Sequence, residues 1–212
     1  MKIAVVCNEV LKADFLSGKG NSPEKAVFIS SPEHIPADAS MVVDLLFENQ
    51  AERKAALRQF LPRPVMVHAV TETLAEIGEP FIRINAWPGF LQHTIWEVAA
   101  LPPQQEQLQE LAAATGWQYR LVADRAGMIS ARVIAVIINE AWFTFGEGIS
   151  TREEIDIAMK SGTNYPYGPF EWGEKIGVNN ICRLLTSMCA ADSRYEIAPA
   201  LKAACKASGV PV

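Results

Sequence analysis

A chain of 212 residues is long enough to bury a hydrophobic core, either as one domain or as two small ones. Half of the residues are hydrophobic and 20% are charged, which is the ordinary composition of a soluble globular protein. The formal net charge of −5 argues against nucleic acid or an anionic membrane surface as the main partner, because both carry negative charge.

The first part of the chain alternates short apolar runs with helical segments, which is typical of a parallel sheet covered on both faces. Strands are expected at residues 2–6, 26–30, 41–47, 65–70, 80–84 and 117–123, with a further apolar stretch at 95–99. Helices are expected at about residues 50–60, 74–77 and 104–115. Pro102 and Pro103 precede the last of these helices and Gly116 ends it.

From residue 126 onward the pattern is helical throughout. A long apolar helix is expected at 128–147, and helices are also expected near 180–192 and 199–208. Ser150 to Glu153 has the spacing of a capping box, which opens a helix that Gly162 ends. We therefore expect two domains, residues 1–124 and 125–212.

Four cysteines, Cys7, Cys182, Cys189 and Cys205, have neither CxxC spacing nor a partner histidine, which predicts buried free thiols and no metal site. The apolar run at the N-terminus is too short for a signal segment and is expected to form a first strand. The apolar run at 133–138 is bounded by polar residues and falls short of a membrane span. These features predict a reduced, cytoplasmic protein without a membrane partner.

A rigid aromatic loop, Gly162-Thr-Asn-Tyr165-Pro-Tyr-Gly168-Pro-Phe-Glu-Trp172, follows the capped helix. Each X-Pro step moves the preceding residue out of the helical region, so Tyr165 and Gly168 should be extended or in a turn. Such a loop is either a packing corner between helices or the floor of a ligand site.

This loop closely resembles the Tyr-Pro-x-Gly-Pro-Phe-Glu loop of 3-hydroxyacyl-CoA dehydrogenases. The segment Glu154-Ile-Asp-x-Ala-Met159 and the stretches 41–48, 85–98 and 124–129 are similar to the same family. The resemblance implies a truncated Rossmann-like doubly wound sheet, followed by an all-α domain like the C-terminal part of those enzymes. It also implies an acyl-CoA-like ligand, and the apolar long helix makes a homodimer the expected assembly.

The resemblance places the catalytic residues where this sequence departs from the family. The acid/base histidine of the family falls on Asn85, and the glutamate that orients it falls on Glu97. Asparagine has no titratable proton near neutral pH, so Asn85 cannot take a hydroxyl proton. His68, at the end of a predicted strand, is the alternative acid/base candidate, since doubly wound sheets bind ligands at that edge. Glu97 has a second interpretation as an ion-pair partner of Arg83 or as a cap of a backbone group.

The resemblance implies a substrate site with six candidate residues: Thr71, Ala131, Tyr165, Gly168, Pro169 and Phe170. Ala131 stands where the family has a substrate-contacting asparagine. The aromatic members have the alternative interpretation of a packed corner between helices.

NAD is the cofactor implied by the resemblance, with Glu48 ending the strand near it. A dinucleotide site needs a glycine-rich turn directly after the first strand. Here that strand is followed by Cys7-Asn-Glu-Val10, and Glu9 would put negative charge where a phosphate should lie. Residues 18–21 lack the phosphate-loop spacing and are expected to form a flexible turn. Glu48 has the alternative of a charge near a helix N-terminus.

These observations leave three alternative functions. The first is a relative of this family that binds an acyl-CoA-type ligand with little or no NAD-dependent hydride transfer. The second is an active NAD-dependent dehydrogenase that uses a relocated acid/base group such as His68. The third is a non-catalytic structural or regulatory homodimer.

Overall fold

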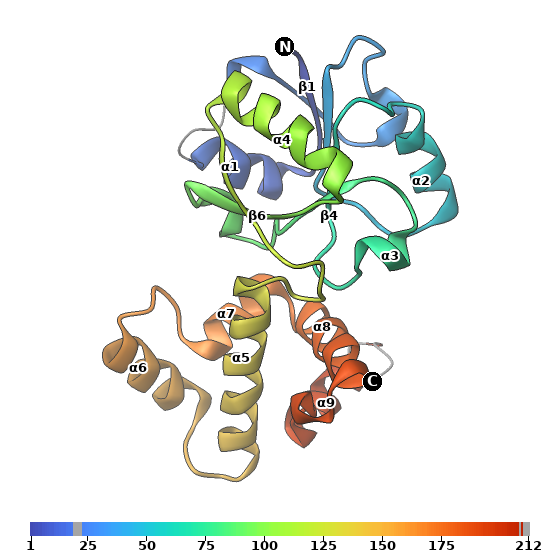
Figure 1. Cartoon of the computed structure of the whole chain (residues 1–212). Helices are drawn as coiled ribbons and strands as arrows, with labels where there is room; N and C mark the ends of the chain where they lie inside the picture. Colours follow the sequence, from blue (N-terminus) through green and yellow to red (C-terminus); the bar gives the residue numbers. More distant parts are fainter. Residues whose placement is uncertain (19–22, 208, 210–212) are drawn as a thin grey trace. The chain divides into compact units, whose positions relative to one another are not determined.

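The computed structural model describes residues 1–18, 23–207 and 209, so most of the turn predicted at 18–21 lies outside the described residues. The chain forms two compact units, Met1–Met128 and Ile129–Val212 (Figure 1). None of the helices in the described part of the chain is long and apolar enough to cross a membrane. The cytoplasmic location stays a prediction.

The first unit is built on a seven-stranded sheet in the order β2-β1-β3-β4-β5-β6-β7. The strands are β1 (Ile3–Val6), β2 (Ala26–Ile29), β3 (Met41–Asp44), β4 (Val65–His68), β5 (Ile82–Ile84), β6 (Ile95–Ala99) and β7 (Gln118–Leu121). Its helices are α1 (Glu9–Ser17), α2 (Ala51–Arg58), α3 (Leu74–Ile77) and α4 (Pro102–Thr115), with short 3-10 turns η1 (Pro23–Lys25), η2 (Pro32–His34) and η3 (Phe90–Gln92).

The expectation of a wholly parallel sheet is wrong at one position. Strands β1 to β5 pair in parallel, but β6 runs antiparallel to β5, and β7 is parallel to β6. The segment between β5 and β6, residues 85–94, contains only the short turn η3. A parallel return needs a crossover of a dozen or more residues, so this segment brings the chain back in the opposite direction.

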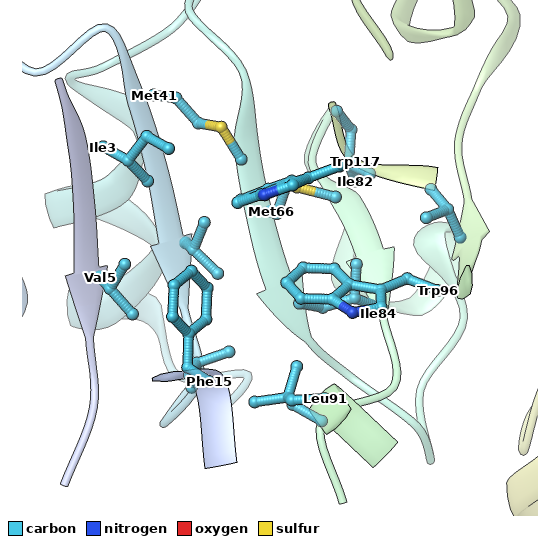
Figure 2. Packing of buried hydrophobic residues seen from close by; sticks show 14 of the residues in the cluster. Ile3, Val5, Phe15, Met41, Met66, Ile82, Ile84, Leu91, Trp96 and Trp117 are labelled. Carbon is cyan, nitrogen blue, oxygen red and sulfur yellow. The ribbon is translucent and has the colours of Figure 1, made fainter. Parts of the chain in front are cut away.

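Both faces of the sheet are covered because its strands alternate apolar residues to either side. On one face Ile3 and Val5 pack with Phe15 of α1 and with Leu108 and Leu111 of α4. Figure 2 shows the centre of this face, where Phe15 meets Trp96 and Trp117 edge to face, each with ring centroids 6.0 Å apart.

The opposite face is packed in the same way by other helices. There the buried strand residues Ala4 and Val6 pack with Leu57 of α2 and Ile77 of α3. Helix α1, which sequence patterning did not predict, therefore supplies part of the core.

The second unit is all helical, with α5 (Ser130–Gly146), α6 (Arg152–Thr163), α7 (Pro169–Ile176), α8 (Val178–Ala191), η4 (Ser193–Tyr195) and α9 (Pro199–Ala207). Helix α5 buries Ala135, Ile138 and Trp142 in the helical core. Asn139 is also buried, and its side chain donates to the Glu196 carbonyl at 2.8 Å and accepts from the Ala198 amide at 2.9 Å. This polar pair of contacts fixes the start of α9 against α5.

Several local predictions in the second unit are corrected. The capping box of α6 is formed by Thr151 and Glu154, one residue later than predicted, and the helix runs past Gly162 to end at Asn164 in the left-handed region. The predicted loop at 162–172 contains the start of α7, because Pro169 suits the first position of a helix.

The prediction of four free thiols is also wrong. Cys182 of α8 and Cys205 of α9 form a disulfide, with Cα atoms 6.4 Å apart. The two residues are 23 positions apart, and their helices pack together, which a spacing rule for short motifs cannot detect. Cys7 and Cys189 remain free, and burial raises the pKa of the Cys7 thiol to about 11.

Candidate active site

The carboxyl ends of β4 and β5 lie side by side and carry two of the predicted catalytic residues. His68 is the last residue of β4 and pairs in register with Ile84, the last residue of β5. Asn85 follows directly. Open α/β sheets bind ligands at this edge, so the structure places both residues where a ligand site is expected.

His68 is held as a neutral hydrogen-bond donor. Its Nδ1 accepts a hydrogen bond of 2.9 Å from the backbone amide of Ala86, which puts the ring proton on Nε2. Burial lowers the pKa of His68 to about 4; a hydrogen bond with the Ile84 backbone opposes this, and the nearby charge of Arg83 lowers it further. A ring in this state can donate through Nε2, but it has no free nitrogen with which to take a proton.

Asn85 is buried, with 6% of its surface exposed. Its Oδ1 accepts a hydrogen bond of 3.1 Å from the amide of Trp87. Its Nδ2 is buried and has no hydrogen-bond partner among the described residues. The side chain therefore presents an amide donor and no basic group.

Glu97 lies on β6, the strand next to β5, which Asn85 directly follows. The antiparallel register pairs Arg83 with Ala99 and Ile84 with Val98. The Glu97 side chain is half-buried. Asn85 thus follows the strand that neighbours the strand of Glu97. His93, by contrast, is exposed, and its ring packs edge to face on Phe90 with ring centroids 5.8 Å apart.

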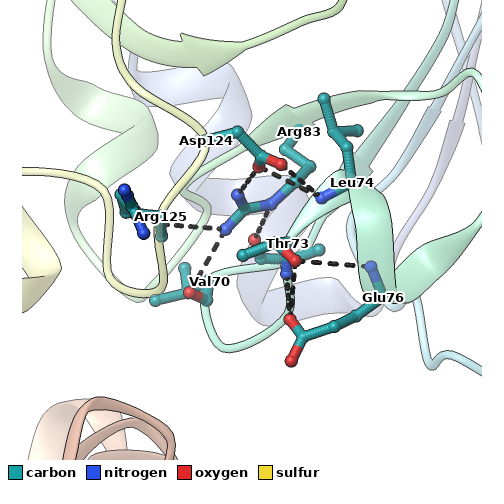
Figure 3. A network of polar contacts seen from close by, with 8 residues as sticks. Val70, Thr73, Leu74, Glu76, Arg83, Asp124 and Arg125 are labelled. Carbon is teal, nitrogen blue, oxygen red and sulfur yellow. Dashed lines mark hydrogen bonds and ion pairs between the residues drawn. The ribbon is translucent and has the colours of Figure 1, made fainter. Parts of the chain in front are cut away.

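The residue predicted as a possible ion-pair partner of Glu97, Arg83, is fully buried in an ion pair with Asp124 (Figure 3). Arg83 also donates to the carbonyl of Ala69 at 2.9 Å, and Asp124 accepts from the amide of Leu74 at 2.9 Å. Burial lowers the pKa of Arg83, and the Asp124 carboxylate counteracts this shift.

This network fixes the loop after β4, which carries the half-buried Thr71. The amide of Gly127 donates to the Val70 carbonyl of the same loop at 2.7 Å. Sequence reasoning did not find Asp124, because a lone acidic residue after a strand has no pattern that reveals its partner.

The residues after β1 do not fit a dinucleotide pyrophosphate. Asn8 caps α1, and its Oδ1 accepts from the amide of Leu11 at 2.9 Å, so one of the amides that could face a phosphate is already bonded. Glu9 stands in the first turn with 89% of its side chain exposed, close to Lys12. Its charge opposes an anion at this helix end.

The acidic residue at the end of β3 is already paired within the protein. Asp44, which is fully buried, takes two hydrogen bonds from Arg53 of α2, at 2.7 and 2.6 Å. Burial raises the pKa of Asp44 and the Arg53 charge counteracts it. Glu48, the predicted cofactor residue, is exposed and its Oε2 accepts from the side chain of Gln50 at 2.8 Å.

In the second unit, the segments that resemble the family, 154–159 and 165–172, form a corner between α6 and α7. Asp156 of α6 accepts hydrogen bonds from the amides of Phe170 at 2.8 Å and Glu171 at 3.1 Å, which caps the N-terminus of α7. The amide of Gly168 donates to the Glu171 carboxylate at 2.9 Å, and Glu171 pairs with Lys160. A Cβ at position 168 would overlap the Asp156 carboxylate, so this position requires glycine.

The predicted substrate residues of the second unit divide between core and surface. Ala131 is fully buried, and Phe170 is 4% exposed and packs on Trp142 with ring centroids 5.4 Å apart. The guanidinium of Arg152 lies over both rings, at 4.7 Å from Trp142 and 4.8 Å from Phe170. Tyr165 is 39% exposed. This packing favours the interpretation of the aromatic residues as a corner.

A groove of about 370 Å³ opens beside Phe170. It is lined by Arg152, Glu153, Asp156, Ile157, Lys160, Phe170, Glu171 and Glu174. Carboxylates outnumber cations in this lining, so the groove does not suit the phosphates of a CoA group. Within the described ranges, no cluster of three or more His, Cys, Asp or Glu side chains could hold a metal ion.

Comparison with known proteins finds a family model that matches the helical unit. The family model for the C-terminal domain of 3-hydroxyacyl-CoA dehydrogenase matches residues 127–210. A 3-hydroxyadipyl-CoA dehydrogenase of Escherichia coli (strain K12) is 33% identical over 146 residues, which are 68% of this chain and 27% of that protein. A 3-hydroxybutyryl-CoA dehydrogenase of Bradyrhizobium diazoefficiens is 35% identical over 98 residues, 45% of this chain and 33% of that protein. The aligned part of the chain thus spans a third or less of these relatives.

Solved structures show the same fold. The (S)-3-hydroxybutyryl-CoA dehydrogenase PaaH1 from Ralstonia eutropha superposes with a TM-score of 0.71 at 21% identity, covering 88% of this chain and 71% of that one. M. tuberculosis FadB2 superposes with a TM-score of 0.76 at 11% identity, covering 98% and 94%. The predicted fold class, a truncated Rossmann-like sheet followed by an all-helical domain, is confirmed.

Proposed function

Because this chain belongs to the 3-hydroxyacyl-CoA dehydrogenase family, we propose that it binds an acyl-CoA-type ligand and transfers little or no hydride. The observation that carries the proposal is Asn85, an amide directly after β5 where acid/base chemistry needs a basic group, with Glu97 on the adjacent strand β6. The ligand class rests on the names of the relatives, which act on CoA thioesters.

Loss of proton transfer is the main reason to expect little turnover. Oxidation of a hydroxyl needs a group that accepts its proton, and general acid–base catalysis contributes roughly 10²–10⁴-fold in rate. Asn85 has no proton-accepting nitrogen. His68 cannot replace it without giving up the hydrogen bond from the Ala86 amide. This argument weighs against the alternative of an active dehydrogenase with a relocated base.

Weak cofactor binding compounds this loss. NAD is expected from the family, but the N-terminus of α1 has the Asn8 cap and the Glu9 carboxylate in place of a glycine-rich turn. Neither Glu48 nor the closed Asp44–Arg53 pair offers a free group at the end of β3. We therefore expect NADH to bind weakly or not at all.

Self-association is part of the same proposal. Val133 and Val136 of α5 and the N-cap residue Ile129 are exposed, at 50%, 38% and 53% of their surfaces. Residues four and three positions apart lie on the same face of a helix, so these three form an apolar stripe. The stripe supports a homodimer formed through the second unit, which is also compatible with the alternative of a purely structural role.

A ligand screen by thermal unfolding tests the proposal. A ligand at 100 times its Kd adds about 2.7 kcal/mol to the stability of the folded state, which is a readily measured shift. Acetyl-CoA and butyryl-CoA should raise the melting temperature, and NAD and NADH should not. A shift with NADH at micromolar concentration, or no shift with any CoA thioester up to millimolar concentration, would overturn it.

A further inference from the structure

The last helix of the second unit, α9, is short and buries few side chains. It has nine residues, and its buried residues are Leu201 and Cys205. Isolated helices shorter than about 12–15 residues are marginal in water, so α9 depends on its packing against α5 and α8 to stay folded. The contacts at its two ends therefore decide whether it stays packed.

Each end of α9 has a different anchor. Just before its first residue, the Asn139 side chain accepts a hydrogen bond of 2.9 Å from the Ala198 amide, which ties this end to α5. Near its last residue, Cys205 is bonded to Cys182 of α8, the helix beside it (Figure 1). Both cysteines are fully buried. The first anchor does not respond to redox conditions, whereas the second exists only in the oxidised state.

The covalent anchor restrains α9 more than packing alone does. The bonded residues are 23 positions apart. A disulfide that closes a loop of this length shifts the equilibrium toward the folded form on the order of 100-fold. As two thiols, the same side chains would still fill the space between the helices, because a buried cysteine packs like a small apolar residue. Reduction therefore keeps the packing and removes the restraint that prevents α9 from opening.

We propose that Cys182 and Cys205 form a redox-controlled latch: α9 stays packed on α8 while the disulfide is intact and opens locally once it is reduced. Forming the bond removes two electrons and two protons from the two thiols, and a disulfide oxidant such as oxidised glutathione takes them up and becomes two thiols. A dithiol reverses the step and is itself oxidised to a disulfide. The inference concerns the second unit alone and does not rest on the proposed ligand.

Another cysteine of α8 cannot exchange with this pair in the folded unit. Cys189 is free and lies seven positions after Cys182. At about 1.5 Å per residue it is about 10 Å further along the helix, whereas an S–S bond is about 2 Å long. Cys189 is therefore the matched control position on the same helix.

Hydrogen–deuterium exchange of the segment 199–207 measures the latch on the unmutated protein. One sample is incubated with oxidised glutathione. The other is reduced with dithiothreitol in dilute denaturant, because the buried sulfurs are reached only after local opening, and is then returned to buffer with dithiothreitol. The oxidised sample, titrated after unfolding, should contain two free thiols, Cys7 and Cys189. Amide exchange in the segment should be on the order of 100-fold slower in the oxidised sample than in the reduced one.

Two single substitutions separate the latch from general effects of the redox treatment. Cys205→Ala removes the bond, so exchange in α9 should be fast in both samples. Cys189→Ala removes a free thiol of the same helix and should leave the difference between the samples unchanged.

Three results would refute the inference. Four free thiols after the oxidising incubation would show that the bond does not form. Equal exchange of α9 in the two samples of the unmutated protein would show that the bond does not restrain it. A difference that persists in Cys205→Ala would assign the response to another group. Failure of every CoA thioester to bind would overturn the proposed function and leave this inference standing.

Discussion

The cap that Asp156 supplies to α7 leads to a prediction about what the family-like signature does. The two carboxylate oxygens of Asp156 accept hydrogen bonds from the amides of Phe170 and Glu171, and Asp156 is 7% exposed. Asn at this position keeps the size but only one acceptor, and its NH2 faces the second amide. Hydrogen bonds to charged groups contribute about 1.5–3 kcal/mol each, so Asp156→Asn should destabilise the second unit by about 2–4 kcal/mol.

Denaturant unfolding followed by circular dichroism measures this loss, with ligand affinity measured in parallel. Asp38→Asn is the control, because Asp38 is an exposed partner of Lys2 and its loss should change the midpoint little. We expect Asp156→Asn to lower stability while the affinity of the folded protein for CoA thioesters stays the same. Unchanged stability with a large loss of affinity would show that the signature contacts ligand and that the corner interpretation is wrong.

Three further predictions concern stability and assembly. Arg83→Met should destabilise the first unit by about 3–5 kcal/mol in chemical unfolding, because it leaves Asp124 and backbone carbonyls without their buried partner; a loss below about 1 kcal/mol would contradict the role of this network. Since the pKa of His68 is lowered to about 4 in the folded state, the unfolded chain binds more protons. The contribution of His68 to the free energy of unfolding should be complete above about pH 6.5 and fall as the pH drops toward 4. The same pH dependence in His68→Gln would rule this out. Val133→Glu with Val136→Glu should convert a dimer to a monomer in analytical ultracentrifugation, and a monomeric unmutated protein would refute the dimer.

Local sequence signals predicted the helices whose first and last residues are typical of helix ends. The helix at 104–115 was predicted close to its observed bounds, since Pro102 and Pro103 mark its first turn and Gly116 ends it in the left-handed conformation. Helix α1 went unrecognised because only Leu11 and Phe15 of its nine residues are buried, which is too short an apolar pattern. Helix α7 was not predicted because the segment Pro166-Tyr-Gly-Pro169 before it has the pattern of a loop.

Features that depend on distant partners could not be predicted. The direction of β6 follows from the path of the chain, and the disulfide depends on how α8 and α9 pack. Asn85 and Glu97 were found through a resemblance, and the sheet order that brings β6 next to β5 depends on distant partners. The buried partner of Arg83 had no local signal, and an equally plausible carboxylate, Glu97, was nearer in sequence.

Turnover of acetoacetyl-CoA with NADH is the measurement that tests the central claim most directly. With Asn85 in place of a base and no glycine-rich turn after β1, consumption of NADH should stay at the enzyme-free background, and Asn85→His alone should restore little. Turnover by the unmutated protein well above that background would contradict the account. If such activity then disappeared in His68→Ala and survived Glu97→Ala, His68 would be the acid/base group after all.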